Sequence, residues 1–237
     1  MKKYKSSAEL KALAKAQLFG NYGTVISAMV VVMIFTVASA FLPSFLIGTE
    51  SVISIIIYYL VSFLLSLFIG IFNSGQAFLY LKLICRHPIS AGDIFYGFRS
   101  HADKALLIQL VLTLTGYVCM APVLLFNVLY SRTGDAKWML LMSAAFVIVM
   151  AVTIIISLML SQSFYLLQDF PDYSAGELLK MSCRMMKGHK GRLFYIQLSF
   201  LPLYLLGLMS CCIAFLWIVP YMNATMANFY MDLVSNR

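Results

Sequence analysis

Five long stretches of the sequence carry no charged side chain. They cover residues 16–49, 51–81, 105–131, 138–168 and 193–231, and are 34, 31, 27, 31 and 39 residues long. About 20 apolar residues are enough for an α-helix to cross the hydrocarbon core of a bilayer. The first four stretches are therefore predicted to hold one crossing each, and the last is long enough for two short crossings. Composition agrees, because 62% hydrophobic and 11% charged residues leave a soluble domain of 237 residues too few polar side chains for its surface.

A recurring pattern divides the chain into three units, at about residues 6–82, 88–168 and 172–233. Each unit opens with a serine and an acid three residues later, a pattern that caps helices, and continues with a pair of long apolar segments. The three pairs are Ser6 with Glu9, Ser90 with Asp93, and Ser174 with Glu177. The repeat predicts one all-α membrane domain over residues 1–237, a polytopic transmembrane bundle with pseudo-threefold symmetry. We expect six helices arranged as three hairpins, each preceded by a short amphipathic interfacial helix.

The expected helices follow from the apolar stretches and their breaks. The predicted hairpins are 24–46 with 53–81, 105–130 with 138–167, and 193–209 with 213–232, and the first turns at Gly48–Glu50. The split of the last stretch is supported because Ile196-Gln197-Leu198 repeats Ile108-Gln109-Leu110 at a hairpin start. The opening helix, residues 6–20, has two alternatives: it lies in the headgroup layer, or it packs on the bundle.

Positive charge is concentrated on one side of the predicted topology. Six crossings place 15 of the 17 Lys and Arg residues on the side of the termini, and only Arg132 and Lys137 on the other. This asymmetry predicts a multi-pass protein of the cell (cytoplasmic) membrane with both termini cytoplasmic. The net charge of +8 alone would suggest nucleic acid, but no nucleic-acid motif accompanies it, so no nucleic-acid partner is expected.

The clearest amphipathic segment begins at Ser174 and ends near Gly188. Its basic face and the turn that follows supply the candidate contacts for lipid phosphate, which are Lys180, Arg184, Lys187, His189, Lys190 and Arg192. Such charges are worth about 1 kcal/mol each near an anionic surface. The expected partners are therefore membrane lipids with anionic headgroups on the cytoplasmic side. A solvated loop and a membrane protein partner are the alternatives.

Uncharged polar residues gather near the end of the second helix of each predicted hairpin. The three sets are Asn73, Ser74 and Gln76; Ser161, Gln162 and Ser163; and Asn223, Thr225 and Asn228. Amides inside a bilayer need partners, so we expect these side chains to face one another and not lipid. Two interpretations stay open: a polar vestibule that faces the cytoplasm, or a hydrogen-bond cluster that locks the bundle.

Groups able to carry chemistry are scarce. The three histidines lie far apart in loops, no acid or base lies within a predicted crossing, and the five cysteines lack zinc-ligand spacing. We expect no catalytic, cofactor or metal site, and hence no enzyme. The favoured function is a non-catalytic accessory, scaffold or lipid-interacting protein. The alternative is a transporter or channel for a small neutral or lipid-like solute, passing through the vestibule between the three hairpins.

Several short runs resemble a known family. They are Lys187–Phe194, Gln197–Phe200, Phe215–Met222, Ala224–Ala227 and Phe229-Tyr230, so the likeness is strongest over residues 187–233 and extends over nearly the whole chain. These runs resemble the bacterial membrane-protein family called domain of unknown function 975. The resemblance implies a bacterial protein of several membrane helices with no assigned activity.

Overall fold

The computed structural model describes residues 4–47 and 51–236, and the chain is helical, without a β-strand, in those ranges. The turn expected at Gly48–Glu50 lies outside them. In chain order the elements are α1 (Ser7–Leu18), α2 (Tyr22–Leu46), α3 (Val52–Ile84), the 3₁₀-helix η1 (Ala91–Phe95), α4 (Tyr96–Arg99), α5 (Ala102–Thr133), α6 (Ala136–Leu160), α7 (Ser163–Asp169), α8 (Ala175–Met185), α9 (Lys190–Leu198), α10 (Leu201–Met209) and α11 (Phe215–Ser235).

Five segments within the described ranges are long and apolar enough to cross a membrane. They are Tyr22–Leu46, Ile53–Ile84, Ala102–Thr133, Ala136–Asp169 and Lys190–Met209. This confirms the prediction of an all-helical chain with segments that are long and apolar enough to span a membrane. Helix α11 is not among the five, because side chains such as Asn223, Asn228 and Asp232 lower its mean hydropathy. A sixth crossing, and with it the arrangement of three transmembrane hairpins, stays a prediction.

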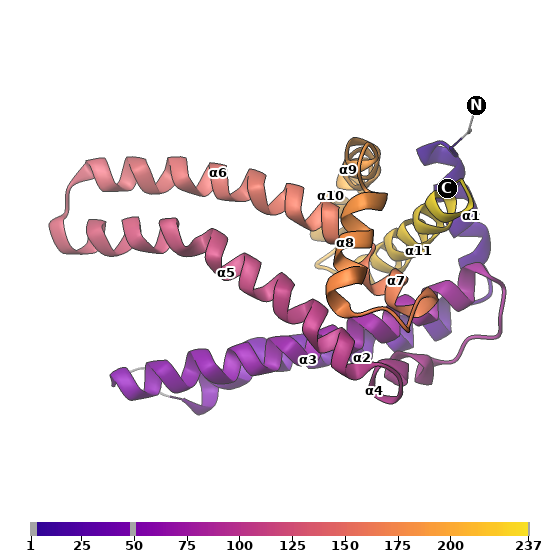
Figure 1. The fold of residues 1–237 in the computed structure, drawn as a ribbon, viewed down its shortest axis with the longest axis horizontal. Coiled ribbons are helices and arrows are strands. Elements are labelled where there is room, and N and C mark those ends of the chain that lie inside the picture. Colours follow the sequence, from indigo (N-terminus) through magenta and orange to yellow (C-terminus); the bar gives the residue numbers. More distant parts are fainter. Residues whose placement is uncertain (1–3, 48–50, 237) are drawn as a thin grey trace.

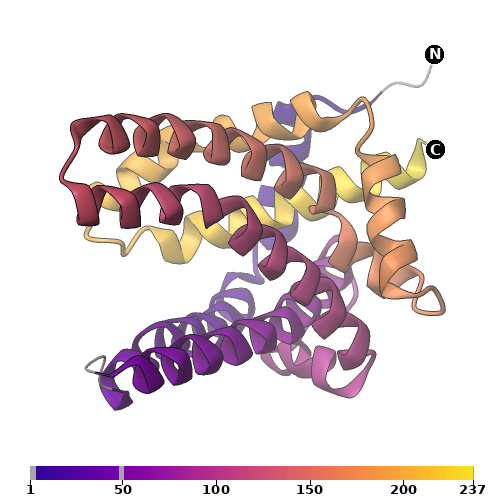
Figure 2. The ribbon, with the colours of Figure 1, turned by 60° about the vertical axis from the view of Figure 1, so that its left-hand side comes forward.

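The long helices extend as arms from one packed end of the molecule. The hairpins α2–α3 and α5–α6 diverge toward their tips, as Figure 1 shows. The short helices α1, α4 and α8 and both chain termini gather at the opposite end (Figures 1 and 2), called the terminal end below. In Figure 2 the α10–α11 turn projects toward the same side as the tips of the other two hairpins, whereas in Figure 1 it lies between those tips and the terminal end.

Helix α1 belongs to the packed core of the terminal end. Leu10, Ala14 and Leu18 are fully buried, and α1 lies against α11. Packing on the bundle, one of the two alternatives for residues 6–20, is therefore present, and a position of α1 in the headgroup layer stays a prediction. The Lys11 amine donates to the Ser199 carbonyl at 3.0 Å and lies over the Phe200 ring. Partial burial lowers the pKa of this amine below its usual value.

Glycines allow η1 and α4 to approach α3 closely. A Cβ atom on Gly75 would lie 1.9 Å from the Ile94 carbonyl oxygen, and one on Gly97 would lie 2.2 Å from that of Ile71. Gly70 similarly faces α5, where its Cβ would meet the Gln109 side chain at 2.3 Å. Only a residue without a side chain fits at these contacts. These close contacts pack η1, α4 and α5 of the second unit against α3 of the first.

The three serine and acid pairs each form a capping box. The side chains of Ser6, Ser90 and Ser174 each accept a backbone hydrogen bond, and the acid three residues on bonds back to the serine N–H. Asp93 also forms a 2.9 Å ion pair with Lys82 at the end of α3. The sequence pattern therefore corresponds to a real local structure at the start of each unit.

Two helices predicted to be continuous are interrupted. The segment 138–167 breaks at Ser161–Gln162, where the Ser182 hydroxyl accepts from the Gln162 N–H at 3.3 Å and donates to the Met159 carbonyl at 2.7 Å. The segment 193–209 breaks at Ser199–Phe200, just before Pro202, whose ring lacks an N–H and crowds the preceding turn. Neighbouring side chains thus satisfy backbone groups that a continuous helix would pair internally.

Candidate functional site

Helix α7 meets the second halves of α3 and α11 at the base of the arms. Gln168, just before the end of α7, donates to the Ser74 hydroxyl at 2.8 Å, and the Tyr165 ring stacks on Tyr230 of α11 at 5.2 Å. Helix α11 also packs directly against α3. Each of these helices closes one of the three sequence units, so the meeting brings residues from all three units together.

A cavity of about 160 Å³ lies between α3, the start of α7 and the middle of α11. Its lining combines amides, hydroxyls and aromatic rings, contributed by Asn73, Gln76, Ala77, Tyr80, Ser161, Phe164, Tyr165 and Asn223. Four of these are among the nine polar residues selected from the sequence, and at least one comes from each set. We call this space the polar cavity. No Lys, Arg, His, Asp or Glu belongs to its described lining.

The other five selected residues bond elsewhere. Ser74 binds Gln168, while Ser163 and Thr225 donate to carbonyls of the preceding helical turn. The Gln162 amide donates to the Ser161 hydroxyl, and its buried Oε1 has no hydrogen-bond partner among the described residues. Asn228 faces α1, where its amide donates to the Gln17 oxygen at 2.6 Å. The nine residues therefore do not form one continuous polar surface.

Two side chains at the polar cavity have unused hydrogen-bonding capacity. Within the described ranges, the half-buried Gln76 amide and the Tyr165 hydroxyl make no hydrogen bond with the protein. Gln76 lies inside the apolar segment Ile53–Ile84, where an unpaired amide is unfavourable. These two groups can thus donate hydrogen bonds to an uncharged ligand and accept hydrogen bonds from it.

Several residues of this region were not selected from the sequence. Asn73 donates to Gln109 of α5 at 3.4 Å, and Gln109 donates in turn to Thr113 at the same distance. Tyr80 and Tyr165 belong to the similar endings of the first two units, so the repeat held a signal for both. Gln109 was part of the repeated Ile-Gln-Leu run. Gln168 could not be selected from the sequence, because its partner Ser74 lies 94 residues away, on α3.

The basic face of α8 lies at the surface of the terminal end. Lys180, Arg184 and Lys187 are exposed, while Leu178 and Met185 on the opposite face are buried. His189 and Lys190 are half-buried, and the His189 ring meets Tyr4 edge-on at 4.8 Å. Three of the six candidate lipid contacts therefore form an exposed basic surface, which we call the α8 basic face.

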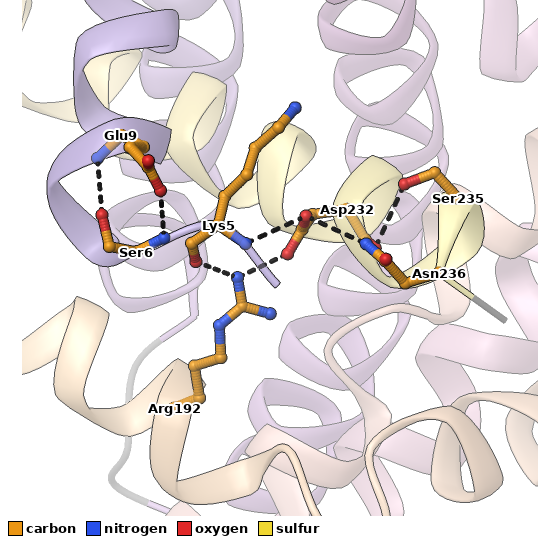
Figure 3. A network of polar contacts seen from close by, with 7 residues as sticks. All are labelled: Lys5, Ser6, Glu9, Arg192, Asp232, Ser235 and Asn236. Atoms are coloured by element: carbon orange, nitrogen blue, oxygen red, sulfur yellow. Dashed lines mark hydrogen bonds and ion pairs between the residues drawn. The ribbon is translucent and has the colours of Figure 1, made fainter. Parts of the chain in front are cut away.

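Arg192 belongs to an internal network instead (Figure 3). Its guanidinium donates at 2.5 Å to the Asp232 carboxylate, whose side chain is 1% exposed, and to the Lys5 carbonyl. The same guanidinium lies over the Tyr4 and Phe229 rings. The expectation that Arg192 meets lipid phosphate overlooked Asp232, which lies 40 residues away in sequence but directly beside it in the fold. The network ties the N-terminal segment and α9 to the end of α11.

The described residues contain no group of three His, Cys, Asp or Glu side chains arranged to hold a metal ion. The apolar segments and packed terminal end are those of a polytopic helical membrane protein. The chain belongs to the family described as protein of unknown function DUF975, whose model matches residues 1–237. The resemblance found in the sequence is thereby confirmed. Comparisons with curated proteins and with solved structures gave no match.

Proposed function

We propose that this protein is a non-catalytic, lipid-interacting accessory or scaffold of the cytoplasmic membrane. The observation that carries the proposal is the α8 basic face, whose charges are exposed while its apolar side is seated on the bundle. A basic helix at the depth where helices leave the bilayer attracts anionic headgroups. The terminal end lies on the cytoplasmic side in this proposal, since nearly all the positive charge is there.

Lipid enrichment tests the proposal. The purified protein would be placed in mixed micelles of phosphatidylglycerol and phosphatidylcholine, and the lipids that it retains would be measured by mass spectrometry. The double variant K180Q/R184Q should lose most of its preference for phosphatidylglycerol, by roughly 30-fold if each charge contributes about 1 kcal/mol.

A matched control is available at the opposite end of the molecule. R132Q/K137Q also removes one arginine and one lysine, both exposed near the tip of the α5–α6 hairpin. It should retain most of the preference for phosphatidylglycerol. Equal losses in the two variants would mean that net charge, and not the α8 basic face, decides lipid binding.

The polar cavity favours a second candidate, passage of a small neutral or lipid-like solute. It is lined by all three units and lies where apolar helices meet. Solute flux in reconstituted vesicles would test it, with N73A/N223A as the variant and N228A as the control, because Asn228 faces Gln17 outside the described lining. A flux that survives N73A/N223A unchanged would exclude this route.

A further inference from the structure

An apolar groove of about 390 Å³ runs between α2, α3 and α11. Its lining is Met29, Val32, Met33, Thr36, Val37, Gln76, Cys212, Phe215, Leu216 and Val219. We call it the α2–α11 groove. Gln76 lines both this groove and the polar cavity, so the two spaces share a side chain. The groove extends from Gln76 toward the start of α11.

One space is apolar and the other is polar, so together they match the hydrocarbon chain and the headgroup of an amphiphile. The groove is apolar apart from Thr36 and Gln76, whereas the polar cavity presents amides and phenols. Charged side chains are absent from the described lining of both. A charged headgroup would have to give up water there without a counter-ion, which is strongly unfavourable in an apolar surrounding.

Gln76, which lines both the groove and the polar cavity, has an amide without a protein hydrogen-bond partner in the described ranges. This amide lies within an apolar membrane segment. The side chain is half-buried, and polar groups withdrawn from water are normally paired. An uncharged polar group held at this point would satisfy the amide and place an attached hydrocarbon chain in the groove.

We propose that the polar cavity and the α2–α11 groove together bind an amphiphile with one hydrocarbon chain and a small, uncharged, hydrogen-bonding headgroup, such as a monoacylglycerol. Asn223, Tyr165 and Gln76 contact the headgroup. Val32, Phe215 and Leu216 contact the chain. The site does not depend on the α8 basic face. It shares the cavity with the transport candidate but requires no passage, so binding and flux can succeed or fail separately.

A second apolar groove in the same molecule serves as a control for chain binding that depends on apolarity alone. This groove, of about 450 Å³, lies between α5 and α6, lined by residues that include Gly116, Tyr117 and Val149. It is of similar size, but no residue of its described lining also lines the polar cavity. An acyl chain that binds only because a groove is apolar should occupy both grooves equally.

Photo-crosslinking distinguishes these outcomes. A monoacylglycerol that carries a diazirine on its chain would be irradiated with the full-length protein in detergent, and the adducts would be mapped by mass spectrometry. We expect saturable labelling of residues 29–37 and 212–219, suppressed by excess monoolein but not by an equal excess of lysophosphatidylglycerol. Labelling of the α5–α6 groove should be weaker and should not saturate.

The variant Q76L/N223L preserves volume but removes two headgroup contacts. It should weaken labelling of the α2–α11 groove by about tenfold or more, and leave the α5–α6 groove unchanged. If the variant does not fold, competition on the unaltered protein decides, together with L216W, which fills the groove and should abolish the saturable labelling. Equal labelling of both grooves, or equal competition by the charged lipid, would overturn the proposal.

Discussion

The α5–α6 hairpin is more apolar than α11, yet the two regions have the opposite surroundings from those that this difference suggests. Along α5 and α6 large side chains such as Val118, Leu140 and Val147 are 72%, 71% and 67% exposed. In α11 the side chains of Ala227, Phe229 and Tyr230 are fully buried. The exposed hairpin offers its apolar surface to lipid, whereas α11 uses its own to bind α1, α3 and α7. Hydrophobicity alone therefore does not identify the structural core of a membrane protein.

The polar residues of the α5–α6 hairpin and of α11 also differ in what they contact. On α6, Ser143 and Ser157 donate only to carbonyls of their own helix. In α11, Asn228 and Asp232 bond to Gln17 of α1 and to Arg192 of α9. The terminal end is thus held by polar contacts between helices, whereas these two serines of α6 make none within the described ranges. This contrast predicts which substitutions matter.

The largest effect is expected at the buried ion pair. Asp232→Ala leaves the Arg192 guanidinium without its counter-ion, which typically costs about 3–5 kcal/mol. The thermal midpoint in detergent should fall steeply. Asp135→Ala, which breaks the exposed pair with Lys137 at the tip of the α5–α6 hairpin, should change stability by less than about 1 kcal/mol. Similar midpoints for the two variants would contradict the distinction between the regions.

A glycine comparison should give the next largest effect. Gly75→Ala places a methyl group against the Ile94 backbone and should destabilise by about 3 kcal/mol, because backbone cannot move aside as a side chain can. Gly116→Ala in α5 meets no atom within 4 Å and should be neutral or slightly stabilising. Chemical unfolding in mixed micelles would measure both, and a stable Gly75→Ala protein would mean that η1 does not lie where the structure places it.

The interruption of the second hairpin provides a smaller effect. Ser182→Ala deprives the Gln162 N–H and the Met159 carbonyl of their shared partner and should cost about 1–3 kcal/mol. Ser157→Ala removes a hydroxyl that is exposed and bonded within its own helix, so its effect should be near zero. Hydrogen exchange should rise at residues 160–164 in the first variant alone.

The smallest effect is a dependence on pH at the start of α8. Hydrogen bonds from the Ser174 backbone and hydroxyl lower the pKa of Glu177. A lowered carboxyl pKa stabilises the fold at pH values above the unfolded pKa, and the stabilisation disappears as pH falls through the folded value. Glu177→Gln should therefore differ from the unaltered protein at pH 7, and the two should converge at the acid end. A constant difference across pH would show that ionisation is irrelevant there.

The sequence predicted features that depend on local pattern. Long apolar stretches located the crossing segments, and the serine and acid pairs located three capping boxes. Cavity residues Asn73, Gln76, Ser161 and Asn223 were selected because amides and hydroxyls in a bilayer need partners. These inferences need only the residue and its immediate chemical surroundings.

Features that depend on remote partners could not be predicted. Arg192 was assigned to lipid because Asp232 lies in another unit, and the break at Ser161–Gln162 depends on a hydroxyl supplied by α8. Asn228 was grouped with the cavity residues, but α1 returns to pair with it. Each error arose where a helix packed against a segment distant in sequence.

We propose that the terminal end and the tips of the hairpins lie on opposite sides of one membrane. Exposed native cysteines mark both ends: Cys85 follows α3 at the terminal end, and Cys211 lies in the α10–α11 turn. Single-cysteine variants in intact cells would be treated with a membrane-impermeant maleimide. We expect Cys211 to be labelled at once, and Cys85 only after permeabilisation. Labelling of both from the same side would contradict the topology, because it would mean that Lys190–Met209 does not cross the membrane.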